Sequence, residues 1–231
     1  MQPDFIYFDI DDTLLDHMHA QQNALSDAYN HYEALQAAGL EDFQNTYKEI
    51  NSRLWLEYSI GRIDRPELSL RRFQDSFTRL GIEIEDSTEV AGFYMNAYRK
   101  HWSWLPGAKE ALDEICEHYP VGFITNGFAE TQKLKVNDFR LKEYSDQVII
   151  SEEVGFLKPH PKIFRYAEEK AGISADKILY VGDSYSSDVK GGKAAGWQVA
   201  WFTKESDAER LSKADFNFDD FSELRAKLNG K

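Results

Sequence analysis

The sequence predicts an α/β protein, in which a parallel sheet with helices on both faces carries an inserted all-helical unit. Three observations support this fold class. From Pro106 onward, short apolar segments alternate with amphipathic helical patterns. Residues 5–8 form a similar apolar run, and residues 17–104 contain helical patterns without a convincing strand. An apolar strand needs neighbours, so we expect residues 5–8 to join the later strands in one sheet.

The inserted unit is expected to contain four helices. Three of the patterns end at Gly39, Gly61 and Gly81, and glycine is the residue most often found just beyond a helix C-terminus. The third pattern also begins clearly, with Asp64 as an N-cap and Pro66 in the first turn. We therefore assign residues 16–104 to a helical unit and residues 1–15 and 105–231 to an α/β core.

The core elements follow one another as a doubly covered parallel sheet requires. The expected strands are 5–8, 121–125, 147–150, 177–181, 198–202 and a short edge strand at 216–218. Helical patterns occupy 130–139, 161–171 and 187–195, with a last helix after residue 218. This is a Rossmann-like arrangement, and ligands of such open sheets bind at the carboxyl ends of the strands.

The composition argues against several function classes. The 231 residues include 27 basic and 40 acidic side chains, so the formal net charge is 27 − 40 = −13. Such a surface repels nucleic-acid polymers and anionic membranes, and we expect neither as a partner. One cysteine, Cys116, excludes an internal disulfide and fits a reducing, cytoplasmic compartment. We expect a monomer or a weak homo-oligomer.

Polar residues follow each of the main strands. They occur in four groups: Asp9-Ile10-Asp11-Asp12-Thr13, Thr125-Asn126-Gly127, Lys158-Pro159-His160-Pro161, and Gly182-Asp183-Ser184 with Asp188 close behind. Each group alone is most simply a turn or a helix cap. Because parallel strands end at the same edge of a sheet, four such groups in order predict a functional site there.

These groups have the chemistry of a phosphoryl-transfer site. Asp9 and Asp11 are two apart, which on a strand places both carboxylates on one face, and Asp183 and Asp188 add negative charge. Mg²⁺ would balance these oxygen ligands, and Mn²⁺ or Co²⁺ could substitute for it. The cation of Lys158 and the polar groups of Thr125 and Asn126 could hold a phosphoryl group. One aspartate could then act as the nucleophile and another as the general acid and base.

Over its whole length the chain resembles the haloacid dehalogenase-like hydrolase superfamily. The matching motifs are Asp9-Ile10-Asp11-Asp12-Thr13-Leu14, Phe123-Ile124-Thr125-Asn126-Gly127, Lys158-Pro159-His160-Pro161-Lys162-Ile163-Phe164, and Val181-Gly182-Asp183-Ser184 with Asp188. The helical insertion is similar to the cap of the superfamily's first cap class.

The resemblance implies a role for each motif residue. Asp9 would be the nucleophile and a Mg²⁺ ligand, and Asp11 the general acid and base, with its backbone carbonyl on the metal. Thr125 and Lys158 would bind the transferring phosphoryl group. At the fourth motif, Asp183 would hold Mg²⁺, and Asp188 would orient Asp183 or a metal-bound water.

The resemblance also narrows the activity. An acid at position 11 favours phosphoester hydrolysis over dehalogenation and phosphonate cleavage. The cap resembles pyrimidine and non-standard nucleotide 5′-monophosphatases in Leu54-Trp55-Leu56-Glu57-Tyr58, Gly61-Arg62-Ile63 and Arg72-Phe73. We therefore expect a Mg²⁺-dependent phosphatase for a small phosphorylated metabolite, with an aspartyl-phosphate intermediate and a nucleoside 5′-monophosphate as substrate.

Several alternatives stay open. A sugar-phosphate or phosphoglycolate-type phosphatase has the same core, while a phosphomutase and a non-enzymatic scaffold fit the sequence less well. Trp55 and Tyr58 lie three residues apart on a cap helix, where they either contact substrate or pack inside the cap. Arg62 and Arg72 could contact an oxygen of the leaving group, but we expect them first to be solvated at the surface.

Overall fold

The computed structural model describes residues 2–230, which fall into two compact units. One contains the chain up to Asp16 and from Trp104 onward, and the other is His17–Ser103.

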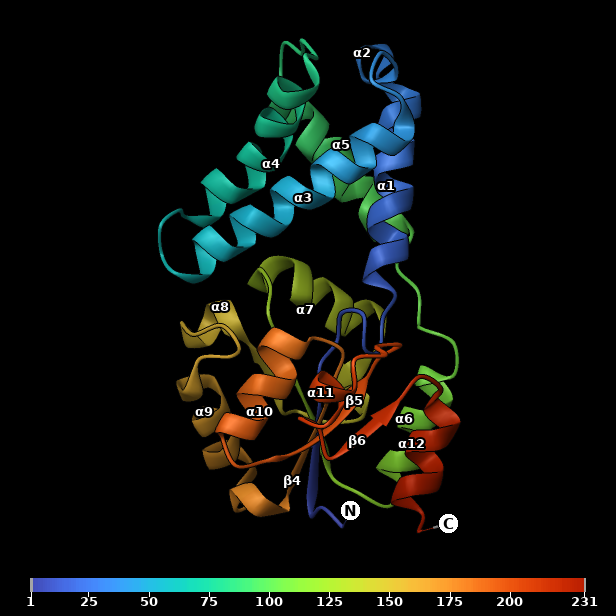
Figure 1. The fold of residues 1–231 in the computed structure, drawn as a ribbon, viewed down its shortest axis with the longest axis vertical. Helices are drawn as coiled ribbons and strands as arrows, with labels where there is room; N and C mark the ends of the chain where they lie inside the picture. Colours follow the sequence, from blue (N-terminus) through green and yellow to red (C-terminus); the bar gives the residue numbers. More distant parts are fainter. Residues whose placement is uncertain (1, 231) are drawn as a thin grey trace. The chain divides into compact units, whose positions relative to one another are not determined.

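The first unit is built on a six-stranded parallel sheet (Figure 1). Its order is β3-β2-β1-β4-β5-β6, so the first strand of the chain lies between β2 and β4. The strands are β1 (Phe5–Phe8), β2 (Val121–Thr125), β3 (Val148–Ile150), β4 (Ile178–Gly182), β5 (Gln198–Phe202) and β6 (Phe216–Phe218). The predicted α/β fold class, with its first strand inside the sheet, is confirmed.

Helices cover both faces of this sheet because its strands carry apolar side chains on both sides. In β1, Ile6 and Phe8 pack in a buried cluster with side chains of α6 and α12, whereas Phe5 and Tyr7 pack with side chains of α9. The helices and helical turns of this unit are α6 (Ala108–Cys116), α7 (Ala129–Asp138), η1 (Leu141–Glu143), α8 (Ser151–Val154), α9 (Pro161–Ala171), η2 (Ala175–Lys177), η3 (Tyr185–Val189), α10 (Lys190–Ala194), α11 (Ala208–Leu211) and α12 (Phe221–Leu228).

Two local differences from the sequence-based expectation concern short elements. The helix expected at 187–195 begins as a π-helical turn, η3, and becomes α-helical only in α10. The four-residue helices α8 and α11 were not predicted, because one turn is too short to show a helical period.

The second unit consists of helices around its own buried cluster, to which Phe43, Tyr47 and Phe73 belong. Its helices are α1 (His17–His31), α2 (Glu33–Gln36), α3 (Leu40–Ser59), α4 (Arg65–Leu80) and α5 (Ser87–Lys100). α4 begins with the expected Asp64 cap, in a reciprocal capping box with Glu67, and ends at a left-handed Gly81.

The first of the four helices expected in this unit is divided in two. Tyr32 adopts an extended conformation between α1 and α2. Its ring packs edge-on against Phe93 of α5, on which His31 also stacks. Packing against another helix thus interrupts a pattern that is continuous in the sequence.

Three residues of the helical unit that were singled out above differ in their surroundings. Arg72 is buried, with 7% of its surface exposed, and its guanidinium lies over the rings of Tyr47, Phe73 and Tyr94. The expectation that Arg72 is solvated is therefore wrong. Trp55 and Tyr58 are half-buried and contact each other edge to face.

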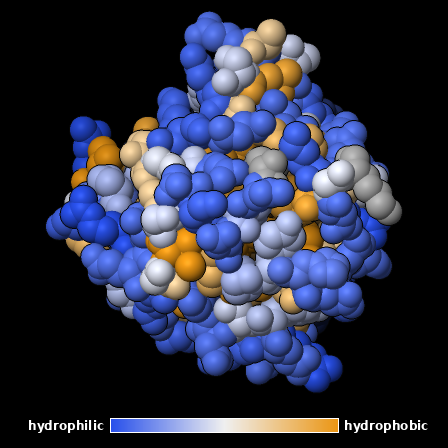
Figure 2. All heavy atoms as spheres, turned by 90° about the horizontal axis from the view of Figure 1, so that it is seen from below, coloured by the Kyte–Doolittle hydropathy of each residue, from blue (hydrophilic) through white to orange (hydrophobic). Residues whose placement is uncertain are grey.

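On the face shown in Figure 2, hydrophilic side chains predominate and the hydrophobic ones form small, separate groups. Among residues 2–230, no helix combines the length and the hydropathy needed to cross a membrane.

Candidate active site

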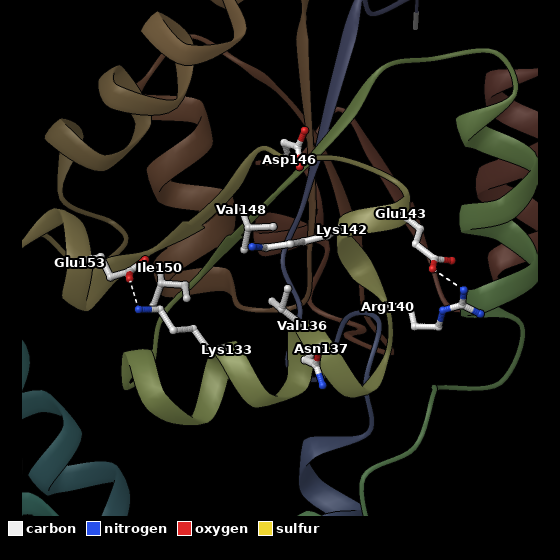
Figure 3. A pocket seen from close by; sticks show the side chains of 10 residues that line it. All are labelled: Lys133, Val136, Asn137, Arg140, Lys142, Glu143, Asp146, Val148, Ile150 and Glu153. Carbon is white, nitrogen blue, oxygen red and sulfur yellow. Dashed lines mark ion pairs between the residues drawn. The ribbon is translucent and has the colours of Figure 1, made fainter.

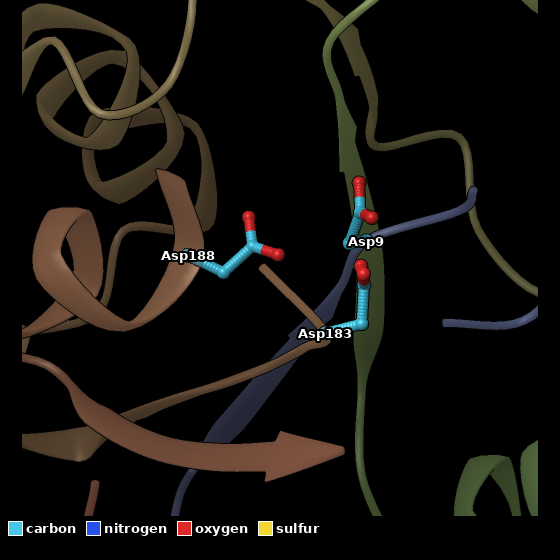
Figure 4. A group of neighbouring side chains, drawn as sticks. All are labelled: Asp9, Asp183 and Asp188. Carbon is cyan, nitrogen blue, oxygen red and sulfur yellow. The ribbon is translucent and has the colours of Figure 1, made fainter. Parts of the chain in front are cut away.

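Three aspartates converge at the carboxyl edge of the sheet. Asp9 directly follows β1, Asp183 directly follows β4, and Asp188 lies in the turn η3. Because β1 and β4 are neighbours, each of the three residues can offer a carboxylate oxygen within 4.8 Å of the others. Figure 4 shows these side chains pointing toward a common region. Of the expected acidic residues, the structure therefore brings Asp9, Asp183 and Asp188 together.

Backbone geometry explains how Asp188 reaches this group. The N–H groups of Asp188 and Val189 both donate to the carbonyl of Ser184, and the bond from Val189, five residues on, makes η3 a π-helical turn. The backbone N–H of Ser184 in turn donates to the Asp188 carboxylate at 2.9 Å. A Cβ atom at Gly182 would lie 2.5 Å from Asp188 Oδ2. Glycine is required there because the carboxylate packs against the end of β4.

One buried lysine faces this acidic group. Lys158 Nζ lies 2.6 Å from Asp9 Oδ1, 2.8 Å from Asp188 Oδ1 and 2.7 Å from the Tyr180 hydroxyl. An ammonium group has three N–H donors, so these three acceptors account for all of them. Three carboxylates against one cation leave an excess of negative charge.

The environment shifts the pKa values in the directions that this charge excess implies. Burial raises the pKa of Asp9 well above its usual range; Lys158 opposes the shift, and Asp188 adds to it. Burial and the neighbouring Asp188 raise the pKa of Asp183 to about 7. Burial disfavours the Lys158 cation, but Asp188 and Asp9 outweigh it, so its pKa is raised.

This donor set fits a hard divalent cation. All three carboxylates supply oxygen, and two of them, on Asp9 and Asp188, belong to side chains with at most 6% of their surface exposed. Carboxylate oxygens are the protein ligands that Mg²⁺ prefers, and a dication would relieve the repulsion between them. Asp9 and Asp183 directly follow strands, so the sheet itself positions these two.

One residue of the second motif, Asn126, is bonded to the backbone of the buried lysine. The Asn126 side chain accepts the backbone N–H of Lys158 at 2.8 Å and donates to its carbonyl at 2.9 Å. Asn126 was expected to bind substrate directly. In this structure its amide instead bridges β2 and the loop that carries Lys158. Thr125 is fully buried at the end of β2.

The position of Asp11 differs from the expectation. β1 ends at Phe8, and the chain then turns tightly: the Ile10 carbonyl accepts the N–H groups of Leu14 and Leu15. Alternation along a strand therefore does not apply to Asp9 and Asp11. The Asp11 carboxylate is held instead by Lys135 and Gln132 of α7.

Sequence reasoning gave no role to several residues that line the site. Thr13 Oγ lies 3.2 Å from Asp183 Oδ1, and the buried Tyr180 hydroxyl donates to the Ile124 carbonyl while it accepts from Lys158. Trp201 Nε1 donates to the Asp183 carbonyl at 2.6 Å. The sequence could have indicated a role for Thr13, because this residue lies inside the first motif. Tyr180 and Trp201 cannot be told apart in the sequence from other apolar residues of the expected strands.

A separate cavity of about 710 Å³ lies beside α7 and β3 (Figure 3). Its lining is mixed in charge, and Lys133 pairs with Glu153 across 2.6 Å. The lining residues are Lys133, Val136, Asn137, Arg140, Lys142, Glu143, Asp146, Val148, Ile150 and Glu153. None of the site residues expected from the sequence lines this cavity.

The sequence of the chain matches the family model described as haloacid dehalogenase-like hydrolase over residues 3–196. The chain belongs to this family. The resemblance stated from the motifs is thus confirmed.

Two proteins to which the chain is similar are named as pyrimidine 5′-nucleotidases. The chain is 37% identical over 204 residues to the pyrimidine 5′-nucleotidase YjjG of Escherichia coli strain K12, covering 87% of this chain and 86% of the relative. It is 32% identical over 203 residues to the pyrimidine 5′-nucleotidase PynA of Streptococcus pneumoniae, covering 86% and 83%. The prediction of a phosphatase of this family is confirmed.

Solved structures of this family share the fold. The HAD-hydrolase YfnB of Bacillus subtilis, whose crystal structure is described as bound to magnesium, matches with a TM-score of 0.86. The two chains are 27% identical, and the match covers 99% of this chain and all of the other.

Proposed function

We propose that this protein is a Mg²⁺-dependent phosphomonoester hydrolase that acts through an aspartyl-phosphate intermediate. The observation that carries this function is the cluster of three aspartates at the carboxyl edge of the sheet, two of which, Asp9 and Asp188, pair with the buried Lys158. Asp9, Asp183 and the Asp11 backbone carbonyl would hold the Mg²⁺ ion, which would neutralise charge on the phosphoryl group when bound. Mn²⁺ or Co²⁺ would substitute in such an all-oxygen site.

The reaction would take place in two steps, phosphoryl transfer to Asp9 and hydrolysis of the aspartyl-phosphate, and side chains of this protein would take part in both. In the first, an Asp9 carboxylate oxygen attacks phosphorus, the bond to the leaving oxygen breaks, and Asp11 gives that oxygen its proton. In the second, Asp11 takes a proton from water as the water oxygen attacks the aspartyl-phosphate, which releases phosphate and restores Asp9. The Thr125 hydroxyl would bind the transferring phosphoryl group, and so would Lys158, which would exchange one of its present acceptors for a phosphoryl oxygen.

The other motif residues would keep this arrangement in place. Asp188 accepts from Lys158 and from the Ser184 N–H, and it would orient Asp183 or a metal-bound water. Asn126 would act through the backbone of Lys158, to which both ends of its side-chain amide are bonded.

The substrate class we propose is a nucleoside 5′-monophosphate with a pyrimidine or non-standard base. Support comes from YjjG and PynA, two similar proteins named as pyrimidine 5′-nucleotidases. The α/β unit would be the catalytic core and the helical unit its cap. A cytoplasmic location agrees with the single cysteine, and light scattering would test the expected monomer or weak homo-oligomer.

Phosphate release from a panel of phosphomonoesters tests this function. The panel contains UMP, dUMP, dTMP, purine monophosphates, sugar phosphates and phosphoglycolate, each with Mg²⁺ and with EDTA. We expect pyrimidine nucleotides to be preferred, and Asp9→Asn and EDTA each to abolish release. Preference for sugar phosphates or phosphoglycolate would keep the chemistry and replace the substrate. No release by the folded, Mg²⁺-loaded protein would overturn the phosphatase, leaving a mutase or a scaffold.

A further inference from the structure

The Asp11 carboxylate accepts hydrogen bonds from two side chains of one helix, α7. Lys135 Nζ lies 2.5 Å from Oδ1, and Gln132 Nε2 lies 2.8 Å from Oδ2. Gln132 and Lys135 are three residues apart in α7, a spacing that places them on one face. Each carboxylate oxygen therefore has its own donor, and rotation of the carboxyl group would break one of the two hydrogen bonds.

This lysine is not an ordinary surface residue. Lys135 has 1% of its surface exposed and Gln132 has 2%. Burying an ammonium group is costly unless a well-placed acceptor compensates for it, and the Asp11 carboxyl group is such an acceptor. Lys133, two residues before Lys135 in α7, is by contrast 62% exposed in its side chain and pairs with Glu153.

The site thus contains two buried lysines with different partners. Lys158 is saturated by Asp9, Asp188 and the Tyr180 hydroxyl, as described above. Lys135 instead forms an ion pair with Asp11. The nucleophile and the proton-transfer residue are each held by a separate cation, and the second cation comes from a helix that carries none of the motif residues.

We propose that Lys135, together with Gln132, is a positioning residue that holds the Asp11 carboxyl group for proton exchange with the leaving oxygen and with water. This role rests on the proposed phosphatase function, in which Asp11 is the general acid and base.

Such a role makes the loss of rate depend on the leaving group. A nucleoside 5′-oxygen is strongly basic and needs the proton from Asp11, whereas p-nitrophenolate leaves without one. Removal of Lys135 should therefore slow the first step for UMP and spare it for p-nitrophenyl phosphate. A defect in folding or in phosphoryl binding would slow both substrates alike.

Pre-steady-state kinetics separate these cases. We would measure uridine release from UMP and the burst of p-nitrophenol from p-nitrophenyl phosphate in the wild type, Lys135→Met, Lys135→Arg and Lys133→Met. For Lys135→Met we expect uridine release to slow on the order of 10- to 100-fold, part of the contribution typical of general acid–base catalysis, with little change in the burst. Lys135→Arg should recover most of the rate, and Lys133→Met should match the wild type.

The outcomes distinguish this role from the function itself. Equal losses for both substrates, a Lys133→Met defect as large as that of Lys135→Met, or a further loss when Lys135→Met is added to Asp11→Asn would each overturn the positioning role alone. Circular dichroism would show that each variant is folded. A folded, Mg²⁺-loaded wild type that releases neither product would overturn the phosphatase function and the positioning role with it.

Discussion

At the scale of single residues, the site depends on side chains that hold other side chains. Lys158 faces two carboxylates, and Asn126 fixes its backbone through two hydrogen bonds. Asp11 is held in the same manner by Lys135 and Gln132. The motifs identify the charged side chains of the site, but the orientation of these side chains depends on neighbours that are distant in the sequence.

Replacing Asn126 by alanine tests this dependence. Asn126→Ala removes both hydrogen bonds to Lys158 and leaves two backbone groups unpaired, which should lower the free energy of unfolding by about 1–3 kcal/mol. Phosphate release should fall as well, because Lys158 loses its fixed position. Asn137→Ala, at an exposed position of α7, is the matched control. If both variants keep wild-type activity, Asn126 has no part in positioning Lys158.

At the scale of elements, local signals specify most boundaries where capping residues are present. The chain before α4 carries Asp64, whose side chain accepts the Glu67 N–H, and the helix stops at a left-handed Gly81. The break at Tyr32 and the π-helical turn η3 have no comparable signal. The first follows from packing against Phe93, and the second from hydrogen bonds to the Ser184 carbonyl.

The α4 cap provides a test at this scale. Asp64→Ala removes the capping box, and an N-cap substitution of this kind typically costs about 1 kcal/mol. We expect a lower midpoint of urea unfolding with unchanged phosphatase activity. Glu85→Ala also removes one negative charge, but from an exposed residue that is not a helix N-cap. This variant should unfold at the same urea concentration as the wild type. Equal midpoints for the two variants would show that the cap does not stabilise the protein.

At the scale of the whole molecule, the acidic site opposes the stability of the metal-free protein. Burial and Asp188 raise the pKa of Asp183 to about 7, whereas an unfolded aspartate titrates near about 4. The folded state therefore binds a proton more tightly than the unfolded state between these values. Stability must fall as the pH rises from about 4 through about 7, because the proton is then lost from the folded state.

Unfolding measurements at several pH values test this linkage. In EDTA, we expect the wild type to unfold at a lower urea concentration at pH 8 than at pH 6, and Asp183→Asn to show a weaker dependence. Mg²⁺ should raise the pH 8 midpoint of the wild type, since a ligand that binds only the folded state stabilises it. It should do little for Asp183→Asn. Equal pH dependence in the two proteins would contradict the assignment to Asp183.

The sequence by itself determined the fold class and the chemical character of the site. Apolar strands, helix caps and polar strand ends are local patterns, and the order of parallel strands brings their carboxyl ends to one edge. Asp9, Asp183 and Asp188 are assembled there because they follow the neighbouring strands β1 and β4, and Lys158 reaches them from the loop between α8 and α9.

Only the tertiary structure decided which groups pair. The Asp11 carboxylate lies with Lys135, 124 residues away along the chain, and Arg72 is buried among aromatic rings. No periodic pattern in the sequence predicts either contact, because each depends on how separate elements pack. Carboxylates and ammonium groups attract one another without regard to their separation in the chain. The pairing is therefore set by which of them the fold brings within hydrogen-bond distance.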